Sequence, residues 1–239
     1  MRQKIRKSIL YIMVLFFPIT LNYFSPYVSI DGAFLGVVSG SVIVFGLLFV
    51  SALFLGRAWC AWLCPAGGIS EFAQTINARA VPVKRLKYVR YGIFTIWLSI
   101  LVLGFVLAGG IKGVNPLHLT DTGFSVDEPF KYITYYMVVL TWLGLSLWLG
   151  KRGACHAICW MSPFLVAGTW LGQKLHLPQL KIKSDPSLCI NCKQCTKACP
   201  MSIVVHEELK KGLISNTDCI RCAECIDVCP KSVLRFNSR

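Results

Sequence analysis

Acidic residues are scarce in this sequence. The 239 residues contain 11 Asp and Glu against 25 Lys and Arg, which gives a formal net charge of +14. Such an excess is typical of nucleic-acid-binding proteins when the basic residues form one patch with interleaved aromatics. Here the basic residues flank apolar runs instead, which indicates membrane topology as their cause. We therefore expect no nucleic-acid partner.

The sequence also lacks a recognisable nucleotide- or flavin-binding motif. No pattern identifies a nucleophile or a general acid for a bond-breaking reaction, so no catalytic residue of that kind is predicted. Hydrophobic residues, by contrast, make up 55% of the chain, and there are 12 cysteines. The hydrophobic fraction exceeds that of an ordinary soluble domain and predicts membrane-spanning segments.

Eight cysteines form two C-x-x-C-x-x-C-x-x-x-C-P runs near the end of the chain. This spacing is the ligand run of bacterial two-cluster ferredoxins, where the fourth cysteine of each run binds the other 4Fe-4S cluster. Zinc sites usually pair their cysteines in twos around a long loop, so two clusters are favoured over zinc or disulfides. The predicted ligands of the first cluster are Cys189, Cys192, Cys195 and Cys229. Those of the second cluster are Cys219, Cys222, Cys225 and Cys199.

Four apolar segments precede these runs, at residues 8–24, 32–55, 91–111 and 132–149. Each is long enough to cross a hydrocarbon core of about 30 Å. The first follows four basic residues as in a signal peptide, but it lacks a small-residue cleavage site, so we expect a retained helix. Pro18 within it predicts a kink.

The basic residues are distributed unevenly between the two sides of this four-span arrangement. Fifteen Lys and Arg lie in residues 1–7, 56–90 and 150–183, whereas the two opposite loops contain two. The positive-inside rule then predicts a multi-pass protein of the cytoplasmic membrane, with both termini in the cytoplasm. That side is reducing, which suits the cysteine runs.

The remaining four cysteines form two C-x-x-x-C elements, each after an apolar segment. Cys60 and Cys64 follow the second segment, and Cys155 and Cys159 follow the fourth. A short amphipathic stretch follows each pair, so the sequence predicts two helix-hairpin repeats about an axis along the membrane normal. Such symmetry would bring the four thiols together as ligands of a third iron–sulfur cluster. Buried structural thiols and redox-active dithiol pairs are the alternatives.

Together these spans, C-x-x-x-C elements and paired ferredoxin motifs resemble the NapH-type family of membrane-bound 4Fe-4S proteins. They are also similar to the iron–sulfur part of nitrous oxide reductase regulators. The resemblance covers essentially the whole chain and implies that electrons are exchanged with membrane quinol and passed to a redox partner. The family ends both short elements with Pro, whereas this sequence has Pro65 after the first and Trp160 after the second.

A quinone is a candidate further ligand, because the implied role involves quinol. Its site would need a proton-accepting group beside an apolar slot. His118 with Asp121 would suit the outer side and His156 the inner side. Glu71 is expected to face solvent or to pair with Arg79.

The predicted fold is an all-α membrane domain of four transmembrane helices, residues 1–178, and a small α+β two-cluster ferredoxin domain, residues 179–239. A linker is expected at residues 177–186. The predicted function is one-electron transfer between a quinol or ferredoxin-type donor and a partner redox subunit. Two other classes remain open: a copper-handling or assembly factor for a respiratory metalloenzyme, since thiolates favour Cu(I), and a redox-sensing membrane anchor.

Overall fold

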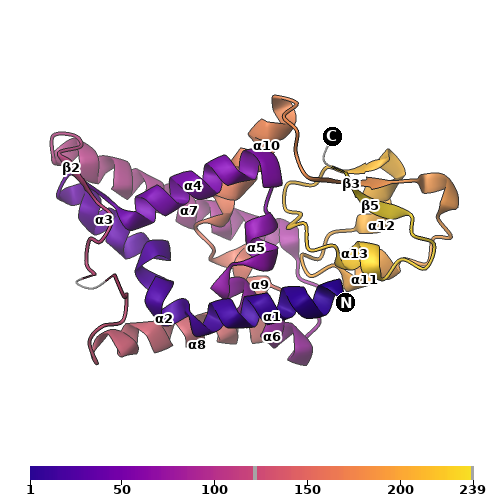
Figure 1. Ribbon diagram of the computed structural model, residues 1–239, viewed down its shortest axis with the longest axis horizontal. Helices are drawn as coiled ribbons and strands as arrows, with labels where there is room; N and C mark the ends of the chain where they lie inside the picture. Colours follow the sequence, from indigo (N-terminus) through magenta and orange to yellow (C-terminus); the bar gives the residue numbers. More distant parts are fainter. Residues whose placement is uncertain (121–122, 238–239) are drawn as a thin grey trace.

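Long helices occupy one end of the molecule and a small domain of short helices and strands occupies the other (Figure 1). The computed structural model describes residues 1–120 and 123–237. The N-terminus lies beside the small domain, where Arg2 forms an ion pair with Asp227. The helices therefore run between the small domain and a far end where the loop at β2 (Gly113–Asn115) lies.

The first apolar segment is a bent helix pair. α1 (Arg2–Leu15) is followed by α2 (Phe17–Thr20) and a 3-10 turn to Phe24, with a bend of 60° at the break. Pro18 lies in the first turn of α2, where its missing N–H and fixed φ fit a new helix start. The predicted kink is confirmed.

The second apolar segment is not one helix, and that prediction is wrong. It consists of the end of α3 (Pro26–Phe34), the short strand β1 (Val37–Ser39) and α4 (Gly40–Leu55). Gly36, at φ +73°, ends α3 with a conformation that glycine adopts without strain. β1 then pairs in parallel with β2, with Val37 opposite Gly113, so the region predicted to be all-α also contains a short pair of strands.

The other two segments are long helices. α7 (Val83–Leu107) begins eight residues before the expected span, and α8 (Lys131–Leu149) matches the prediction closely. These two are long and apolar enough to cross a membrane, and the bent α1–α2 segment would make a third. Membrane association is thus indicated, but the count of four spans is not confirmed within the described residues.

Short helices follow α4 and α8, and the second helix after each of these long helices packs against the other long helix. α5 (Ala58–Trp62) and α6 (Pro65–Ile76) follow α4, and α6 packs on α8. α9 (Gly153–Ala157) and α10 (Ser162–Lys174) follow α8, and α10 packs on α4. The α4–α10 contact is close because Gly168 faces the backbone of Phe49, 2.6 Å from where a Cβ would lie.

The small domain contains a three-stranded antiparallel sheet in the order β4–β3–β5. Its strands are β4 (Leu213–Ile214), β3 (Lys181–Ser184) and β5 (Leu234–Asn237), and Ile182 of β3 pairs with both neighbours. Its helices are α11 (Gln194–Ala198), α12 (Val205–Glu208) and α13 (Glu224–Asp227). This agrees with the expected α+β character.

The predicted linker at 177–186 is part of the packed structure. Gln179 is completely buried, and its side-chain amide donates to the carbonyls of Ala52 and Leu53 at 3.2 and 3.1 Å. The Leu180 N–H donates to the carbonyl of Phe54 at 2.8 Å. These donors bond to carbonyls at the end of α4, where no further helical turn supplies N–H groups. The two parts are therefore joined by contact as well as by the chain.

Candidate functional site

The first predicted ligand set lies at one place in the small domain. Cys189, Cys192, Cys195 and Cys229 line a single small cavity. Lys193, at φ +58°, ends the loop and starts α11, which turns Cys195 back toward the loop cysteines. The structure thus brings together the three cysteines of one run and the fourth of the other.

The second set is built in the same way but lies deeper. Cys219, Cys222 and Cys225 come from the second loop and α13, and Cys199 follows α11, which packs against α13. Burial raises the pKa of Cys199 to about 11, and burial with neighbouring thiolates raises those of Cys222 and Cys225 further. Iron binds thiolate, so proton release must accompany cluster assembly here.

The C-x-x-x-C cysteines also converge, as the sequence predicts. Cys60 lies on α5, Cys64 immediately precedes α6, Cys155 lies on α9 and Cys159 follows it. All four contact the core of the helical part, and Cys60 also contacts the core of the small domain. Burial and the neighbouring Cys60 raise the pKa of Cys64 well above its usual value. The four thiols are therefore electrostatic neighbours at the junction of the two parts.

Two buried guanidinium groups flank Cys60. Arg57 Nη2 lies 4.0 Å from the Cys60 sulfur, and Arg152 Nη1 donates to the Cys60 carbonyl at 2.7 Å. Gly67 makes room for this arrangement, since a Cβ there would lie 2.7 Å from the Cys60 carbonyl oxygen. Two positive charges therefore lie close to Cys60, so this position suits an anionic ligand group.

Two hydroxyl groups lie near Cys155 of the second cysteine pair. Ser70 Oγ on α6 lies 3.7 Å from the Cys155 sulfur and 3.1 Å from Ser146 Oγ on α8. The indole of Trp142 donates to the same Ser70 oxygen at 3.0 Å. The helix that follows the first cysteine pair thus positions a cysteine of the second pair.

Glu71 occupies a buried ion-pair network, so its expected exposure or pairing with Arg79 is wrong. It is 1% exposed, and its carboxylate accepts from Arg6 at 2.7 Å and from Arg152 at 3.0 Å. Burial opposes ionisation, but Arg152 and Arg6 hold the pKa of Glu71 down at about 2. A polar residue on an amphipathic stretch gave no sequence signal for this role, because its partners lie on α1 and α9.

A second buried pair joins the two parts beside the ferredoxin cysteines. Asp218, the residue before Cys219, accepts from Arg57 at 2.8 Å and from Arg90 at 3.0 Å. Burial opposes the ionisation of Asp218, but both guanidinium groups lower its pKa. Arg57 therefore contacts both cysteine regions, a role that sequence reasoning missed.

Arg221 lies between two cysteines of the second ferredoxin run and is completely buried. Its Nε, Nη1 and Nη2 have no hydrogen-bond partner among the described residues, and the side chain points at Gly56 before the first C-x-x-x-C element. A buried, unpaired guanidinium is costly unless an anion lies nearby. Its position between cluster ligands offers such an anion.

The two histidines predicted for a quinone site have other partners in the structure. His118 pairs with Asp31 at 2.7 Å, and its predicted neighbour Asp121 lies outside the described residues. His156 is completely buried beside Asp218, and burial lowers its pKa to about 3. Neither histidine lines the cavity described next.

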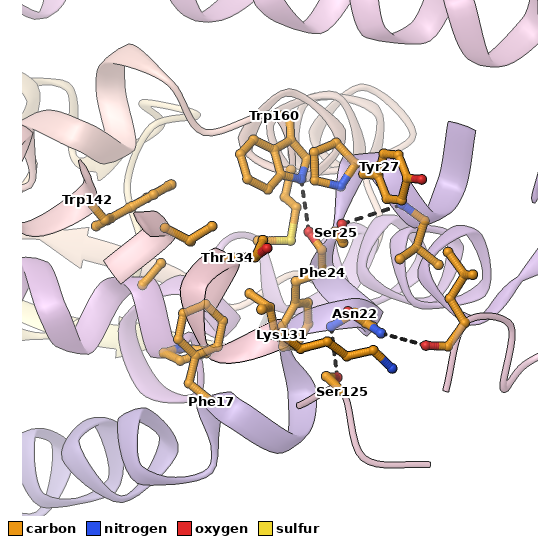
Figure 2. Close-up of a pocket in the computed structure, with 18 of the residues that line it drawn as sticks. Phe17, Asn22, Phe24, Ser25, Tyr27, Ser125, Lys131, Thr134, Trp142 and Trp160 are labelled. Atoms are coloured by element: carbon orange, nitrogen blue, oxygen red, sulfur yellow. Dashed lines mark hydrogen bonds between the residues drawn. The ribbon is translucent and has the colours of Figure 1, made fainter. Parts of the chain in front are cut away.

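An apolar cavity of about 570 Å³ lies in the helical part. Figure 2 shows its walls: Trp142 and Trp160 on one side, Phe17 below them, and Lys131 near Asn22 and Ser125. Cys64 also lines it, so the cavity extends from polar groups of the far-end loop to the C-x-x-x-C cysteines. Cavities of this size bind small molecules.

Residues 1–120 and 123–237 contain no cluster of side chains suited to a single metal ion. Nowhere in these ranges do three His, Cys, Asp or Glu side chains converge closely enough for one metal ion. A cubane cluster separates its ligand sulfurs by its own width, so this finding concerns mononuclear sites.

Two families of iron–sulfur domains match the chain. Residues 188–234 match a 4Fe-4S dicluster domain, and residues 38–84 match a 4Fe-4S binding domain. The first match spans both ferredoxin runs, and the second includes Cys60 and Cys64. No solved structure matches the chain.

Several curated proteins are similar over most of the chain. The methylamine utilization ferredoxin-type protein MauN of Methylobacillus flagellatus is 27% identical over 73% of this chain and 60% of its own length. The putative electron transport protein YccM of Escherichia coli is 23% identical over 75% of this chain and 51% of its own. The chain spans 51% to 66% of the length of the relatives it matches. The domain matches and these ferredoxin-type relatives fit the NapH-type family of 4Fe-4S proteins that the sequence resembles.

Proposed function

We propose that this protein is a multi-pass membrane electron-transfer protein that passes single electrons between a quinol or ferredoxin-type donor and a partner redox subunit. Iron–sulfur electron transport itself follows from the dicluster domain and the ferredoxin-type relatives. The observation that carries the proposal is the position of Cys60, which contacts the core of the helical part and that of the ferredoxin domain. An electron path between membrane and ferredoxin domain would pass through this junction.

A third iron–sulfur cluster held by Cys60, Cys64, Cys155 and Cys159 is part of this proposal. The match of residues 38–84 to a 4Fe-4S binding domain supports it, since two of these cysteines lie there. When bound, a cluster would supply a one-electron centre at the junction. Arg57 and Arg152 would then stabilise the thiolates beside it.

The buried charges support anionic clusters at this junction. Five arginines are completely buried in the described part of the chain: Arg6, Arg57, Arg90, Arg152 and Arg221. The carboxylates buried or half-buried beside them are Glu71, Asp218 and Glu224, which leaves at least two positive charges unmatched. A 4Fe-4S core with four thiolates has a net charge of about −2, which would offset such a surplus.

The two-repeat architecture and the cytoplasmic position of both termini complete the proposal. The reciprocal packing of α6 on α8 and of α10 on α4 is the relationship that a parallel repeat would produce. The N-terminus, α5, α9 and the ferredoxin domain gather at one end of the helices, where the basic residues also concentrate. The positive-inside rule places that end in the cytoplasm.

The apolar cavity is the proposed quinone site. Its volume of about 570 Å³ suits a quinone ring. Because Cys64 lies in its wall, a bound ring would lie beside the C-x-x-x-C cysteines. Neither predicted histidine lines it, so proton exchange would use Glu128 or Lys131 at its polar end.

Iron and acid-labile sulfide per chain, measured on anaerobically purified protein, test the proposal. We expect about twelve irons in the wild type and about eight in Cys60→Ala and Cys155→Ala. Cys189→Ala serves as the comparison, because it should remove one cluster of the ferredoxin domain and leave the third cluster in place. About eight irons in all three of wild type, Cys60→Ala and Cys155→Ala would overturn the third cluster. A wild-type value below about four would overturn the electron-transfer proposal itself.

A further inference from the structure

The two ferredoxin loops have the same local sequence pattern but opposite surroundings. Each begins Cys-Ile-x-Cys, with Ile190 in the first run and Ile220 in the second. Ile220 is 1% exposed, whereas Ile190 is 58% exposed. Because both runs fold into equivalent loops, the difference comes from what covers them.

The second loop is covered by the helical part. Trp62 on α5 lies with its indole nitrogen 3.5 Å from the Arg221 carbonyl, and the Gln3 side chain donates to the Cys222 carbonyl at 2.9 Å. The loop therefore already has its redox neighbour within the same chain. The first loop follows β3 at the end of the domain away from the long helices (Figure 1).

The surface around the first loop has two exposed apolar side chains with two exposed lysines nearby. Leu188 and Ile190 are both more than half exposed, and Cys192 in the same loop is exposed as well. Lys193 and Lys231 are exposed and line the same cavity as the first set of cysteines. An apolar patch with charged residues at its edge is typical of a protein-docking surface.

We propose that this surface, formed by Leu188, Ile190, Lys193 and Lys231, docks a small acidic one-electron carrier protein. The lysines fit a partner with carboxylates around its own redox centre, and the two apolar side chains fit a short apolar contact. One electron would leave the carrier's reduced centre, which is oxidised by one electron, and reduce the cluster bound by Cys189, Cys192, Cys195 and Cys229 by one electron. No bond forms or breaks, and no proton is required.

This inference rests on the proposed electron-transfer function, and it adds an order to the electron path. Electrons would enter from the soluble carrier, or leave to it, at the exposed loop, and the covered loop would face the C-x-x-x-C cysteines. The ferredoxin domain would therefore be a relay with one open and one occupied face. Electron transfer between two proteins needs only a small, transient interface, which two apolar residues and two lysines can provide.

The test is stopped-flow electron transfer from reduced flavodoxin, an acidic carrier, to the full chain in detergent under anaerobic conditions. We expect Ile190→Glu and the pair Lys193→Glu with Lys231→Glu each to lower the second-order rate constant about tenfold at low salt. The wild-type rate should fall with ionic strength, and the double variant should lose most of that dependence. Lys183→Glu, at an exposed position of β3 outside the cavity, makes one such Lys-to-Glu change, half that of the double variant, and should leave the rate unchanged.

Three further readouts separate the outcomes. Iron content and reduction by dithionite should match the wild type in every variant, so that a slower rate reports docking. If these stay normal but the flavodoxin rate is unaffected by Ile190→Glu and by the double lysine variant, the docking surface is wrong and electron transfer stands. If no variant or wild-type chain holds iron, the proposed function fails as well. Self-association that Ile190→Glu abolishes would identify a second copy of the chain as the occupant and overturn the carrier.

Discussion

Arg57 and Asp218, which are 161 residues apart in the chain, form a buried ion pair of 2.8 Å between the two parts of the molecule. Arg57 follows the end of α4 and lies beside Cys60, while Asp218 precedes Cys219. The pair therefore ties the first C-x-x-x-C element to the second ferredoxin loop. Its burial makes it a determinant of domain docking, because neither charge can be left unpaired at low cost.

Asp218→Asn should loosen this junction. The change leaves Arg57 and Arg90 buried without their carboxylate, which costs about 3–5 kcal/mol for a buried pair. We expect a lower melting temperature and faster proteolysis near residues 177–186, measured on the detergent-solubilised protein. Asp227→Asn removes an exposed pair with Arg2 and should cost at most about 1 kcal/mol. Equal effects of the two variants would contradict a special role for the buried pair.

Glu71 should make stability depend on acid pH. Its pKa is about 2 in the folded protein against a usual value of 4.5, because Arg152 and Arg6 stabilise the carboxylate. A lowered folded pKa stabilises the fold above pH 4.5, and this stabilisation is lost as the pH falls from 4.5 toward 2. Thermal unfolding from pH 7 to pH 2.5 should show the loss.

Glu71→Gln provides the comparison for that pH series. The variant lacks the titrating carboxylate, so it should be less stable than the wild type at pH 7, and the difference should shrink as the pH falls toward 2.5. A constant difference across this range would show that the carboxylate charge is not what stabilises the network.

Gly168→Ala should weaken the contact of α10 with α4. A Cβ at this position would lie 2.6 Å from the Phe49 carbonyl oxygen and 2.9 Å from the Ala52 Cβ, so the helices must separate. We expect destabilisation of about 1–3 kcal/mol, measured as a drop in melting temperature. Gly46→Ala in α4 has open space and should be neutral or stabilising by up to about 1 kcal/mol. Similar stability changes in both variants would contradict the packing role of Gly168, since Ala has the higher helix propensity at both positions.

Filling the apolar cavity should impair reaction with quinol. Thr134 lines the cavity, and Thr134→Trp would occupy part of its volume. We expect the apparent KM for a soluble quinol in cluster reduction to rise about tenfold, with dithionite reduction unchanged. Ile133→Trp introduces the same side chain at an exposed neighbouring position outside the cavity. If Thr134→Trp behaves like Ile133→Trp, quinone does not bind in this cavity.

Local patterns predicted the parts of the fold that depend on neighbouring residues. The helix α8 follows from its apolar run, the bend near Pro18 follows from proline chemistry, and the two cysteine runs predict the dicluster domain. The interruption of residues 32–55 was not predicted, because their composition is mostly apolar and the break depends on pairing of β1 with the distant β2. Apolar runs indicate burial or membrane insertion, but not the continuity of a helix.

In the candidate site, too, local patterns were predictable and contacts between distant segments were not. The matching positions of the two C-x-x-x-C elements led to the prediction that Cys60, Cys64, Cys155 and Cys159 could lie together, and in the structure these four thiols are neighbours. The buried partners of Glu71, Asp218 and Arg57 were not predictable, because ion pairs between distant segments leave no periodic signal. Glu71 meets its partners only because α1 and the start of α9 pack beside α6. Asp218 meets Arg57 and Arg90 only because the second ferredoxin loop packs beside the end of α4 and α7.

The sequence by itself determined the chemistry of this protein: cysteines at ligand spacing, apolar helices, and basic residues beside them. It could not distinguish Ile190 from Ile220, because the two lie at the same place in the same motif. Only the tertiary structure decided that Ile220 is covered by the helical part while Ile190 is exposed. Ligand spacing is a property of a few neighbouring residues, whereas burial depends on which distant surface packs against them.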